Sequence, residues 1–274
     1  YQTCAERGIA GTELLRPVAS NLMRFGGLVQ TFVGSFGAVA LAELGRFDEA
    51  IAVGRSAFGI ANTAGHAYSV SVSCFGIGHA LALRGDFENA LGPLQEGLRQ
   101  IEVHSVAATV PWVAGRIAYV YARLGRLDEM DQAAALTLDP GVGEYTPSMM
   151  HPFALIWLAR AALHIGRADQ ARDLAGRAVA QDGLGEADEG VRAWGRWLEC
   201  ECVRSEGTAV SDALGTLHEV LGAARARGMR PLVAHCLATQ AALARDSTAA
   251  TGALDLAIEL GMSTLAGEIR GLRH

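Results

Sequence analysis

The sequence predicts an all-α fold that is built as a stacked array of helix-turn-helix repeats. One short stretch with a central glycine recurs along the 274 residues. Its period of about 40 residues is typical of stacked arrays. Half of the residues are hydrophobic, and Ala, Leu and Gly outnumber the aromatic residues. Proline is scarce, with 7 residues, and runs of β-branched residues are few. These observations favour closely packed helices over strands.

The repeated stretch has the composition of a hinge between two helices. Its first copy, residues 44–50, reads LGRFDEA, and further copies follow at 83–90, 124–130 and 165–171, with a degenerate copy at 205–208. Glycine adopts the left-handed conformation that ends a helix. The acidic residues after it favour the positive end of the next helix. The stretch is therefore structural, and its glycines are Gly45, Gly85, Gly125, Gly166 and Gly207.

Helical periodicity between the hinges predicts five to six repeats within residues 26–261, a helix of a preceding or partial repeat at 1–25, and a capping helix at 262–274. The predicted helix pairs are 28–44 with 47–63, 67–83 with 87–103, 107–124 with 127–137, 152–165 with 168–181, 190–204 with 211–226, and 231–244 with 249–260. Two prolines and two glycines make an irregular stretch expected at 138–147. The sixth hinge, 245–248, lacks glycine, so irregular geometry is expected after residue 236.

Large side chains recur thirteen residues before each hinge glycine. Equivalent positions in a stacked array line up along one face. The row is therefore either core between the repeats or a set of anchors along a binding surface, and a regular stripe of this kind more often packs. Its members are Phe32, Val72, Trp112, Phe153 and Trp194.

The basic residues exclude several classes of chemistry. All 23 of them are arginine, and the chain has no lysine. A P-loop for phosphates and Schiff-base catalysis both need a lysine, so the chain carries neither. The net charge of −6 and the scattered arginines indicate no nucleic-acid surface. The uncharged stretches 25–42 and 56–83 are interrupted by small polar residues, so no membrane span is expected.

Cysteine, histidine and serine also lack the spacings of known sites. The five cysteines match no zinc pattern, and Cys200 and Cys202 point to different sides of a predicted helix. Free buried thiols in a reducing cytoplasm are expected. The eight histidines form no metal motif, and no serine lies in a nucleophile elbow. We therefore predict that the chain is not an enzyme and binds no metal and no cofactor.

The hinge resembles that of tetratricopeptide repeats, in which the second helix opens with Gly-x-aromatic-acid-acid-Ala. The matching residues are Phe47, Phe87, Ala50, Ala90 and Ala171, with Gly78 and Tyr121 at the small and aromatic positions of the first helix. The usual repeat is shorter, so the chain is similar to the long variety. The resemblance implies a right-handed superhelical solenoid in which the first helix of each repeat lines the concave face.

A narrower resemblance covers most of residues 21–270. The segments 21–44, 110–125 and 227–236 and the tail 257–262 resemble the C-terminal region of bacterial adenylate/guanylate cyclase-like proteins. The run GMRPLVAHC is the most specific part of this resemblance. Proteins of this family carry a cyclase domain, an AAA-type ATPase and then repeats of this kind. The resemblance implies a cytoplasmic sensor arm whose partners include attached ATPase or cyclase domains.

The expected function is a non-catalytic binding or sensor module for a protein or peptide segment. An effector pocket or catalytic pocket in the solenoid groove is the alternative, and a scaffold for homo-oligomers is a lower one. The loop at 138–147 is expected to cover the middle of the groove. Counting back from each hinge places thirteen residues in the groove as binding candidates: Phe32, Phe75, His79, Trp112, Tyr119, Arg123, Phe153, Arg160, His164, Trp194, Trp197, Glu201 and Arg204.

Overall fold

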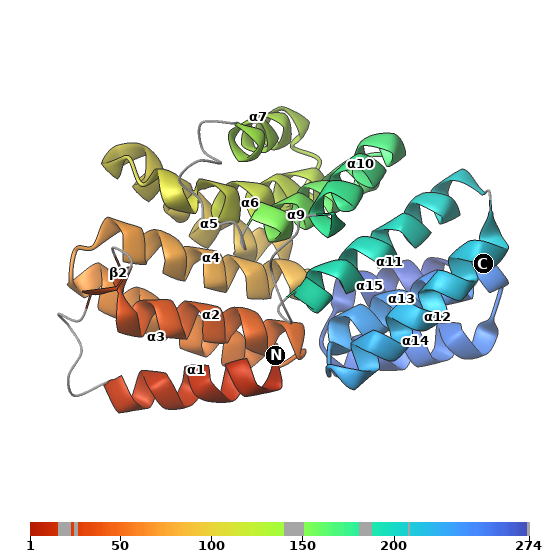
Figure 1. Cartoon of the computed structure of the whole chain (residues 1–274), viewed down its shortest axis with the longest axis horizontal. Coiled ribbons are helices and arrows are strands. Elements are labelled where there is room, and N and C mark those ends of the chain that lie inside the picture. The colour runs from red at the N-terminus through yellow and green to blue at the C-terminus, as the bar shows by residue number, and fades with distance from the viewer. Residues whose placement is uncertain (16–22, 25–26, 140–150, 181–187, 208, 273–274) are drawn as a thin grey trace.

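The computed structural model describes residues 1–15, 23–24, 27–139, 151–180, 188–207 and 209–272 (Figure 1). This part of the chain is all-α, apart from two strands of two residues each and one 3-10 turn. The strands β1 (Met23–Arg24) and β2 (Gly27–Leu28) pair antiparallel. Within the described residues, no helix is long and apolar enough to cross a membrane.

The helices agree with the six predicted pairs to within two residues at nearly every end. The third pair is the exception, because the 3-10 turn η1 (Ala107–Thr109) replaces the start of its first helix. The pairs are α2 (Val29–Glu43) with α3 (Phe47–Thr63), α4 (Ala67–Arg84) with α5 (Phe87–His104), α6 (Val110–Arg123) with α7 (Leu127–Leu138), α9 (His151–His164) with α10 (Ala168–Val179), α11 (Asp188–Glu206) with α12 (Val210–Ala226), and α13 (Arg230–Ala244) with α14 (Ser247–Glu259). The last helix is α15 (Ser263–Gly271).

Each predicted hinge glycine has the left-handed backbone conformation that the sequence predicts for it. Gly45 and Gly85 have φ angles of +81° and +88°, and the other three also lie in the left-handed region. At the first hinge the amide of Arg46 donates to the carbonyl of Leu41 at 2.9 Å, which closes the end of α2. This conformation strains a residue that carries a Cβ, so glycine is favoured there.

The sixth hinge is regular, and the expectation of irregular geometry after residue 236 is wrong. Arg245 takes the place of the missing glycine, with a φ of +53°. The carboxylate of Asp246 then caps α14 by accepting from the amides of Thr248 at 2.9 Å and Ala249 at 3.1 Å. The cap stabilises the start of the next helix, so the turn forms although an arginine occupies the left-handed position.

The N-terminal expectation needs a correction as well. Helix α1 covers Gln2–Leu15, whereas a helix continuing to about residue 25 was expected. Met23 and Arg24 pair with Leu28 and Gly27 instead, because the two glycines at 26–27 are poor helix formers. The segments 16–22 and 25–26 lie outside the described residues, as does most of the expected irregular stretch, from residue 140 onward.

The first helices of successive pairs pack against one another along the inside of the array. Helix α2 packs on α4, α4 on α6, α6 on α9, α9 on α11 and α11 on α13. The array also curves until its two ends meet, as Figure 1 shows for the red and blue helices. Leu260 packs against Gly45, and the hydroxyl of Thr264 donates to the carbonyl of Gly85 at 2.8 Å. The early and the late repeats are therefore in direct contact.

Candidate functional site

The thirteen predicted groove residues fall into two groups in the structure. One group is packed into the interior, where Phe75, His79, Trp112 and Trp194 are buried and Phe32 and Phe153 are partly buried. The second group lines one pocket, which the structure builds from several repeats. Its seven predicted members are Tyr119, Arg123, Arg160, His164, Trp197, Glu201 and Arg204.

The row of large side chains contributes to the interior. The ring of Trp112 meets that of Phe32 edge-on, with centroids 6.4 Å apart, and lies 5.7 Å from the ring of Phe75. Trp194 of α11 meets the ring of His235 in α13 edge-on at 5.6 Å. Rings of different repeats thus contact one another, which is the arrangement expected of packing between repeats.

A buried polar chain fills the interior beside these rings. The guanidinium of Arg116 in α6 is fully buried and donates from Nε to Nδ1 of His79 at 3.2 Å. Since Nδ1 accepts, neutral His79 carries its hydrogen on Nε2, which lies 3.3 Å from Oε1 of Glu43. The other oxygen of Glu43 accepts from Nε1 of Trp194 at 3.0 Å. Four helices are joined through one buried carboxylate.

Burial lowers the pKa values of Arg116 and His79 in this polar network. It lowers the pKa of Arg116 to about 9, although the carboxylate of Glu43 opposes the shift. Burial also lowers the pKa of His79, and the nearby carboxylate of Glu43 opposes that shift only in part. A neutral imidazole is therefore interposed between a buried cation and a buried anion. This half of the interior is sealed by Phe75, whose ring centre lies 4.2 Å from the Arg116 guanidinium carbon.

The pocket lies farther along the array, between α6, α9, α11, α13 and α15. Its volume is about 300 Å³, and its walls combine polar side chains with an apolar side formed by Leu163, Ala238, Leu265 and Ile269. Pockets of this composition, with a few convergent polar groups, are the usual sites for small ligands.

Arg160 is the central group of the pocket. The residue is only 5% exposed. Its guanidinium carbon lies 4.8 Å from the ring centres of Tyr119 and Trp157 and 4.7 Å from that of Trp194. These rings stabilise the cation through their faces. Within the part of the chain that the structure describes, no carboxylate pairs with it. Its polar contacts are long, at 3.4 Å to Nε2 of His235 and 3.5 Å to the Tyr119 hydroxyl.

Tyr119 and Arg123 extend this set of donors by one turn of α6. Nη1 of Arg123 donates to the Tyr119 hydroxyl at 3.0 Å, and Nη2 pairs with Glu268 of α15 at 2.5 Å. Burial alone would raise the pKa of Tyr119, but the charges of Arg160 and Arg123 outweigh burial and lower it. The phenol oxygen therefore lies in a positive environment.

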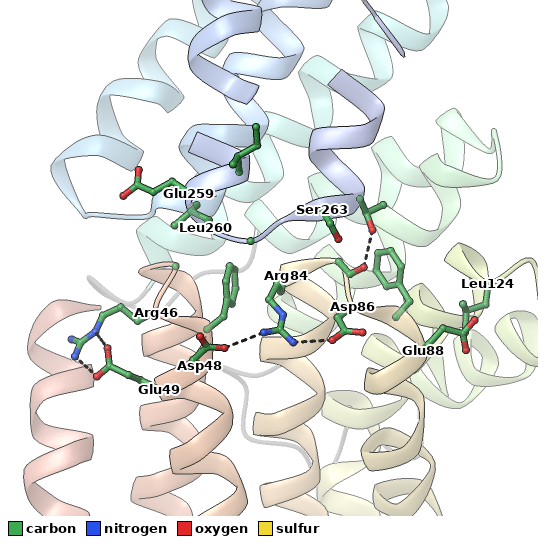
Figure 2. Close-up of a pocket in the computed structure, with 17 residues that line it drawn as sticks. Arg46, Asp48, Glu49, Arg84, Asp86, Glu88, Leu124, Glu259, Leu260 and Ser263 are labelled. Carbon is green, nitrogen blue, oxygen red and sulfur yellow. Dashed lines mark hydrogen bonds and ion pairs between the residues drawn. The ribbon is translucent and has the colours of Figure 1, made fainter. Parts of the chain in front are cut away.

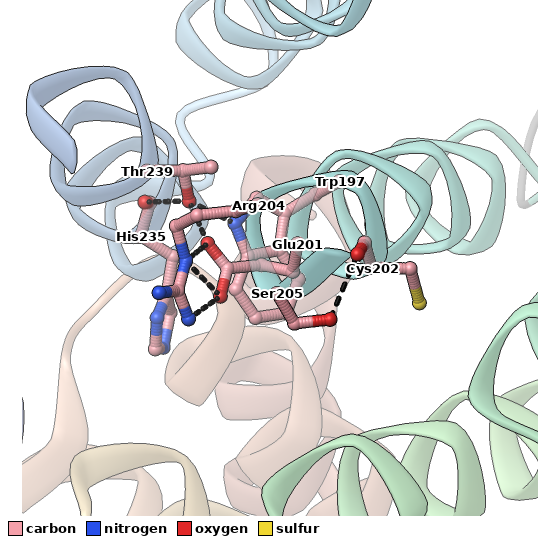
Figure 3. Close-up of polar contacts among 7 residues, drawn as sticks. All are labelled: Trp197, Glu201, Cys202, Arg204, Ser205, His235 and Thr239. Carbon is pink, nitrogen blue, oxygen red and sulfur yellow. Dashed lines mark hydrogen bonds and ion pairs between the residues drawn. The ribbon is translucent and has the colours of Figure 1, made fainter. Parts of the chain in front are cut away.

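On the opposite wall the carboxylate of Glu201 is already occupied (Figure 3). Arg204 contacts it with Nε at 3.0 Å to each oxygen and with Nη2 at 2.8 Å. The Thr239 hydroxyl lies 2.6 Å from Oε1 and accepts from Nε1 of Trp197 at 2.9 Å. The charge of Glu201 is thus compensated locally by Arg204 and does not reach Arg160.

His235 is neutral near pH 7. Burial lowers the pKa of its imidazole well below the ordinary value, and the charges of Arg160 and Arg123 lower it further. Its ring lies 4.9 Å from that of Trp197 and 5.6 Å from that of Trp194. A second cation at this point would repel Arg160, so the neutral form is the one that the surroundings favour.

Sequence reasoning missed His235, Thr239 and Glu268. A signal for Thr239 exists, because five first helices carry a polar side chain six residues before the left-handed hinge residue. Once Arg245 is recognised as the sixth hinge, Thr239 completes that series, which reads His79, Tyr119, Arg160, Glu201 and Thr239. Glu268 reaches the pocket only because α15 folds back across the array, which no local pattern encodes.

A larger cleft lies at the junction of the two ends of the array (Figure 2). Its volume is about 720 Å³, and hinge residues and the turn before α15 line it. Its two arginines are already paired, since Arg46 binds Glu49 and Arg84 contacts Asp48 at 3.2 Å and Asp86 at 2.8 Å. We therefore regard this cleft as a joint between the two ends of the array, and we place the candidate site in the smaller pocket.

Within the described ranges, no group of three or more His, Cys, Asp or Glu side chains is placed to hold a metal ion. Burial raises the pKa of Cys74 and Cys200 to about 12 and that of Cys202 to about 11, so these thiols stay protonated and unreactive.

Comparisons with protein-family models, with curated proteins and with solved structures find no match to this chain.

Proposed function

We propose that the chain is a non-catalytic sensor module that binds a small effector in the pocket around Arg160. In this proposal the array is a right-handed superhelical solenoid of tetratricopeptide-like repeats. It reports the effector to the ATPase or cyclase part of a larger signalling protein. The observation that carries the proposal is the convergence of seven predicted groove residues on one pocket, while the other six lie wholly or partly in the interior.

A small effector fits this geometry better than a bound peptide. A peptide-binding groove presents its aromatic anchors to the partner, whereas Phe75 and Trp112 are buried under other side chains. The space that remains is about 300 Å³, which is at the lower end of the volumes of small-molecule sites. Donors from α6 and α9 meet an apolar wall from α13 and α15 there. A ligand would therefore touch helices of several repeats together.

The proposal is tested by thermal shift with a library of small metabolites and a matched library of peptides. Ala242 lines the pocket, so Ala242→Trp should fill the pocket and abolish stabilisation by the active metabolite. Ala135 is exposed on α7, and Ala135→Trp should leave the response intact. Stabilisation by peptides alone, with no effect of Ala242→Trp, would overturn the proposal.

A protein partner is the second candidate, and the larger cleft favours it. Ile258 lines that cleft and is 54% exposed, next to the charged hinge residues. Protein interfaces commonly have an apolar centre and a polar rim, and Ile258 with its charged neighbours has this arrangement on a small scale. Ile258→Asp would separate the two candidates, because it should weaken a protein complex and leave metabolite binding unchanged.

A further inference from the structure

We propose that the pocket binds a small organic carboxylate through Arg160. We further propose that this carboxylate competes with Glu268 for Arg123, because Glu268 forms an ion pair with Arg123 in the structure. This inference rests on the proposed function, because it names the ligand class of the same pocket. It is carried by the charges of the pocket, the surroundings of Arg160, the neighbouring Tyr119 and His235, the contact of Glu268 and the apolar wall.

The charges of the pocket do not balance. Three arginines line it, Arg123, Arg160 and Arg204, against two carboxylates, Glu201 and Glu268. Arg204 and Glu201 neutralise each other through a three-contact pair. Arg123 and Glu268 form the second pair. Arg160 is the remaining cation, so one negative charge would complete the pocket.

The surroundings of Arg160 select the shape of that anion. A buried cation is stable only with a partner that repays the lost hydration. Aromatic rings cover the guanidinium on several sides, at 4.7 to 4.8 Å from its carbon. Strong acceptors can therefore approach only in its plane, as a carboxylate does when it binds arginine through two parallel hydrogen bonds.

Neighbouring groups point the same way. The Tyr119 oxygen accepts from Arg123 and Arg160, and no acceptor for its own hydrogen is recorded among the described residues. The phenol can therefore donate to a ligand. His235 is neutral and next to Arg160, so it adds no charge that would compete for the anion.

Glu268 is a carboxylate that the chain itself places at this site. Its oxygen lies 2.5 Å from Nη2 of Arg123, although its side chain is 50% exposed. It comes from α15, a helix of nine residues that is held to the second hinge by Thr264. A ligand carboxylate that reaches both Arg160 and Arg123 competes with Glu268, so Glu268 weakens binding.

The apolar wall of the pocket indicates an organic acid. Leu163, Ala238, Leu265 and Ile269 offer no donors to the body of a ligand. A hydrated inorganic anion gains nothing from such a wall, whereas an aromatic or branched acid buries its apolar surface there. Benzoate is a suitable probe, and benzamide is its uncharged analogue of nearly equal shape.

The test measures binding of benzoate, benzamide and inorganic phosphate at constant ionic strength, by calorimetry and by tryptophan fluorescence. Trp197 lines the pocket and Trp194 contacts Arg160, so the fluorescence reports the site itself. We expect saturable binding of benzoate, with benzamide and phosphate at least about tenfold weaker.

Two variants should move the affinity in opposite directions. Arg160→Met should lower the affinity for benzoate by about tenfold or more, and Glu268→Gln should raise that affinity about threefold to tenfold. Arg172→Met is the matched control, because Arg172 pairs with Glu206 on the outer surface at 2.6 Å. It should change nothing. A purely structural role for both residues predicts weaker binding in both variants.

Several outcomes would overturn the inference. If benzoate and benzamide bind equally well, the pocket does not need a charged ligand. If only phosphate binds, the pocket does not need an organic ligand. If Glu268→Gln binds benzoate more weakly, Glu268 does not compete with the ligand for Arg123. If an uncharged metabolite binds and Ala242→Trp blocks it, the proposed function stands and the ligand class falls. If Ala242→Trp has no effect on any ligand, both proposals fall.

Discussion

Arg116 and Arg160 are both buried arginines on neighbouring first helices, but their surroundings differ. Arg116 reaches a carboxylate through His79, and rings seal it from solvent. Arg160 reaches no carboxylate within the described residues and lies at the wall of a pocket. The fold thus compensates one buried cation internally and leaves the other to be compensated from outside. The same residue type is structural in α6 and available for binding in α9.

The largest effect should follow from removing the internal counter-charge. Glu43→Gln leaves Arg116 buried without an anion, which should cost about 3–5 kcal/mol of the free energy of unfolding. Urea denaturation followed by circular dichroism measures it. The double variant Glu43→Gln with Arg116→Met should recover most of the loss. If the single variant is as stable as the wild type, Arg116 does not depend on Glu43.

Acid should destabilise the surroundings of both Arg116 and Arg160, because each contains a histidine, His79 and His235 respectively. The pKa of His79 and that of His235 are lowered in the folded chain. Between the lowered value and the ordinary value near 6.5, the unfolded chain holds more protons than the folded one. Stability is therefore complete above about pH 6.5 and falls as the pH drops, by about 1.4 kcal/mol per pH unit for each histidine at most.

Denaturation curves measured from pH 7 to pH 5 give this slope. His235→Gln should reduce it by the contribution of one histidine, and His79→Gln should do the same in the sealed region. A slope that neither variant changes would show that carboxylates, rather than these imidazoles, control the stability in acid.

Arg160→Met should behave in the opposite way to Glu43→Gln. It removes a buried charge that lacks a carboxylate and replaces it with an apolar chain of similar length. Such replacements are neutral or stabilising, so the free energy of unfolding should stay the same or rise by about 1 kcal/mol. The lost contacts with three rings limit the gain. A loss of several kcal/mol would mean that Arg160 is structural, like Arg116.

The smallest effect belongs to arginines on the surface. Arg46 pairs with Glu49 three residues later, and both are exposed to solvent. Arg46→Gln should change the free energy of unfolding by less than about 0.5 kcal/mol, because exposed ion pairs are screened and cost side-chain entropy. A larger change in urea denaturation would mean that burial is not what separates Arg46 from the two interior arginines, Arg116 and Arg160.

Most of the fold could be predicted because its signals are local. The hinge glycines and the periodicity between them located the helix pairs, and the left-handed angles at Gly45 and Gly85 show why glycine stands there. The sixth hinge is the exception, because Arg245 adopts the left-handed conformation without glycine. The sequence signal that does mark this turn is Asp246, which caps α14. A local rule fails where a neighbouring interaction takes over its role.

The candidate site could be predicted only in part, for a different reason. Tyr119, Arg160 and Glu201 share one register before their hinges, so periodicity brings them to one face. Some candidates are buried in the interior and others line the pocket. This division depends on how the late repeats pack against the early ones. Glu43 meets Trp194 across 151 residues, and Glu268 meets Arg123 across 145. Contacts over such separations depend on the total curvature of the helices, which no single repeat specifies.

The return of α15 to the early repeats also has a kinetic consequence. Thr264 meets Gly85 across 179 residues, so this contact becomes possible only late as a chain emerges from the ribosome. Local helix pairs form quickly, whereas joining segments so distant in sequence is slow. A nascent chain that lacks α15 would have its helices but an unfinished pocket. The appearance of binding during synthesis would therefore report the arrival of α15 at the early repeats.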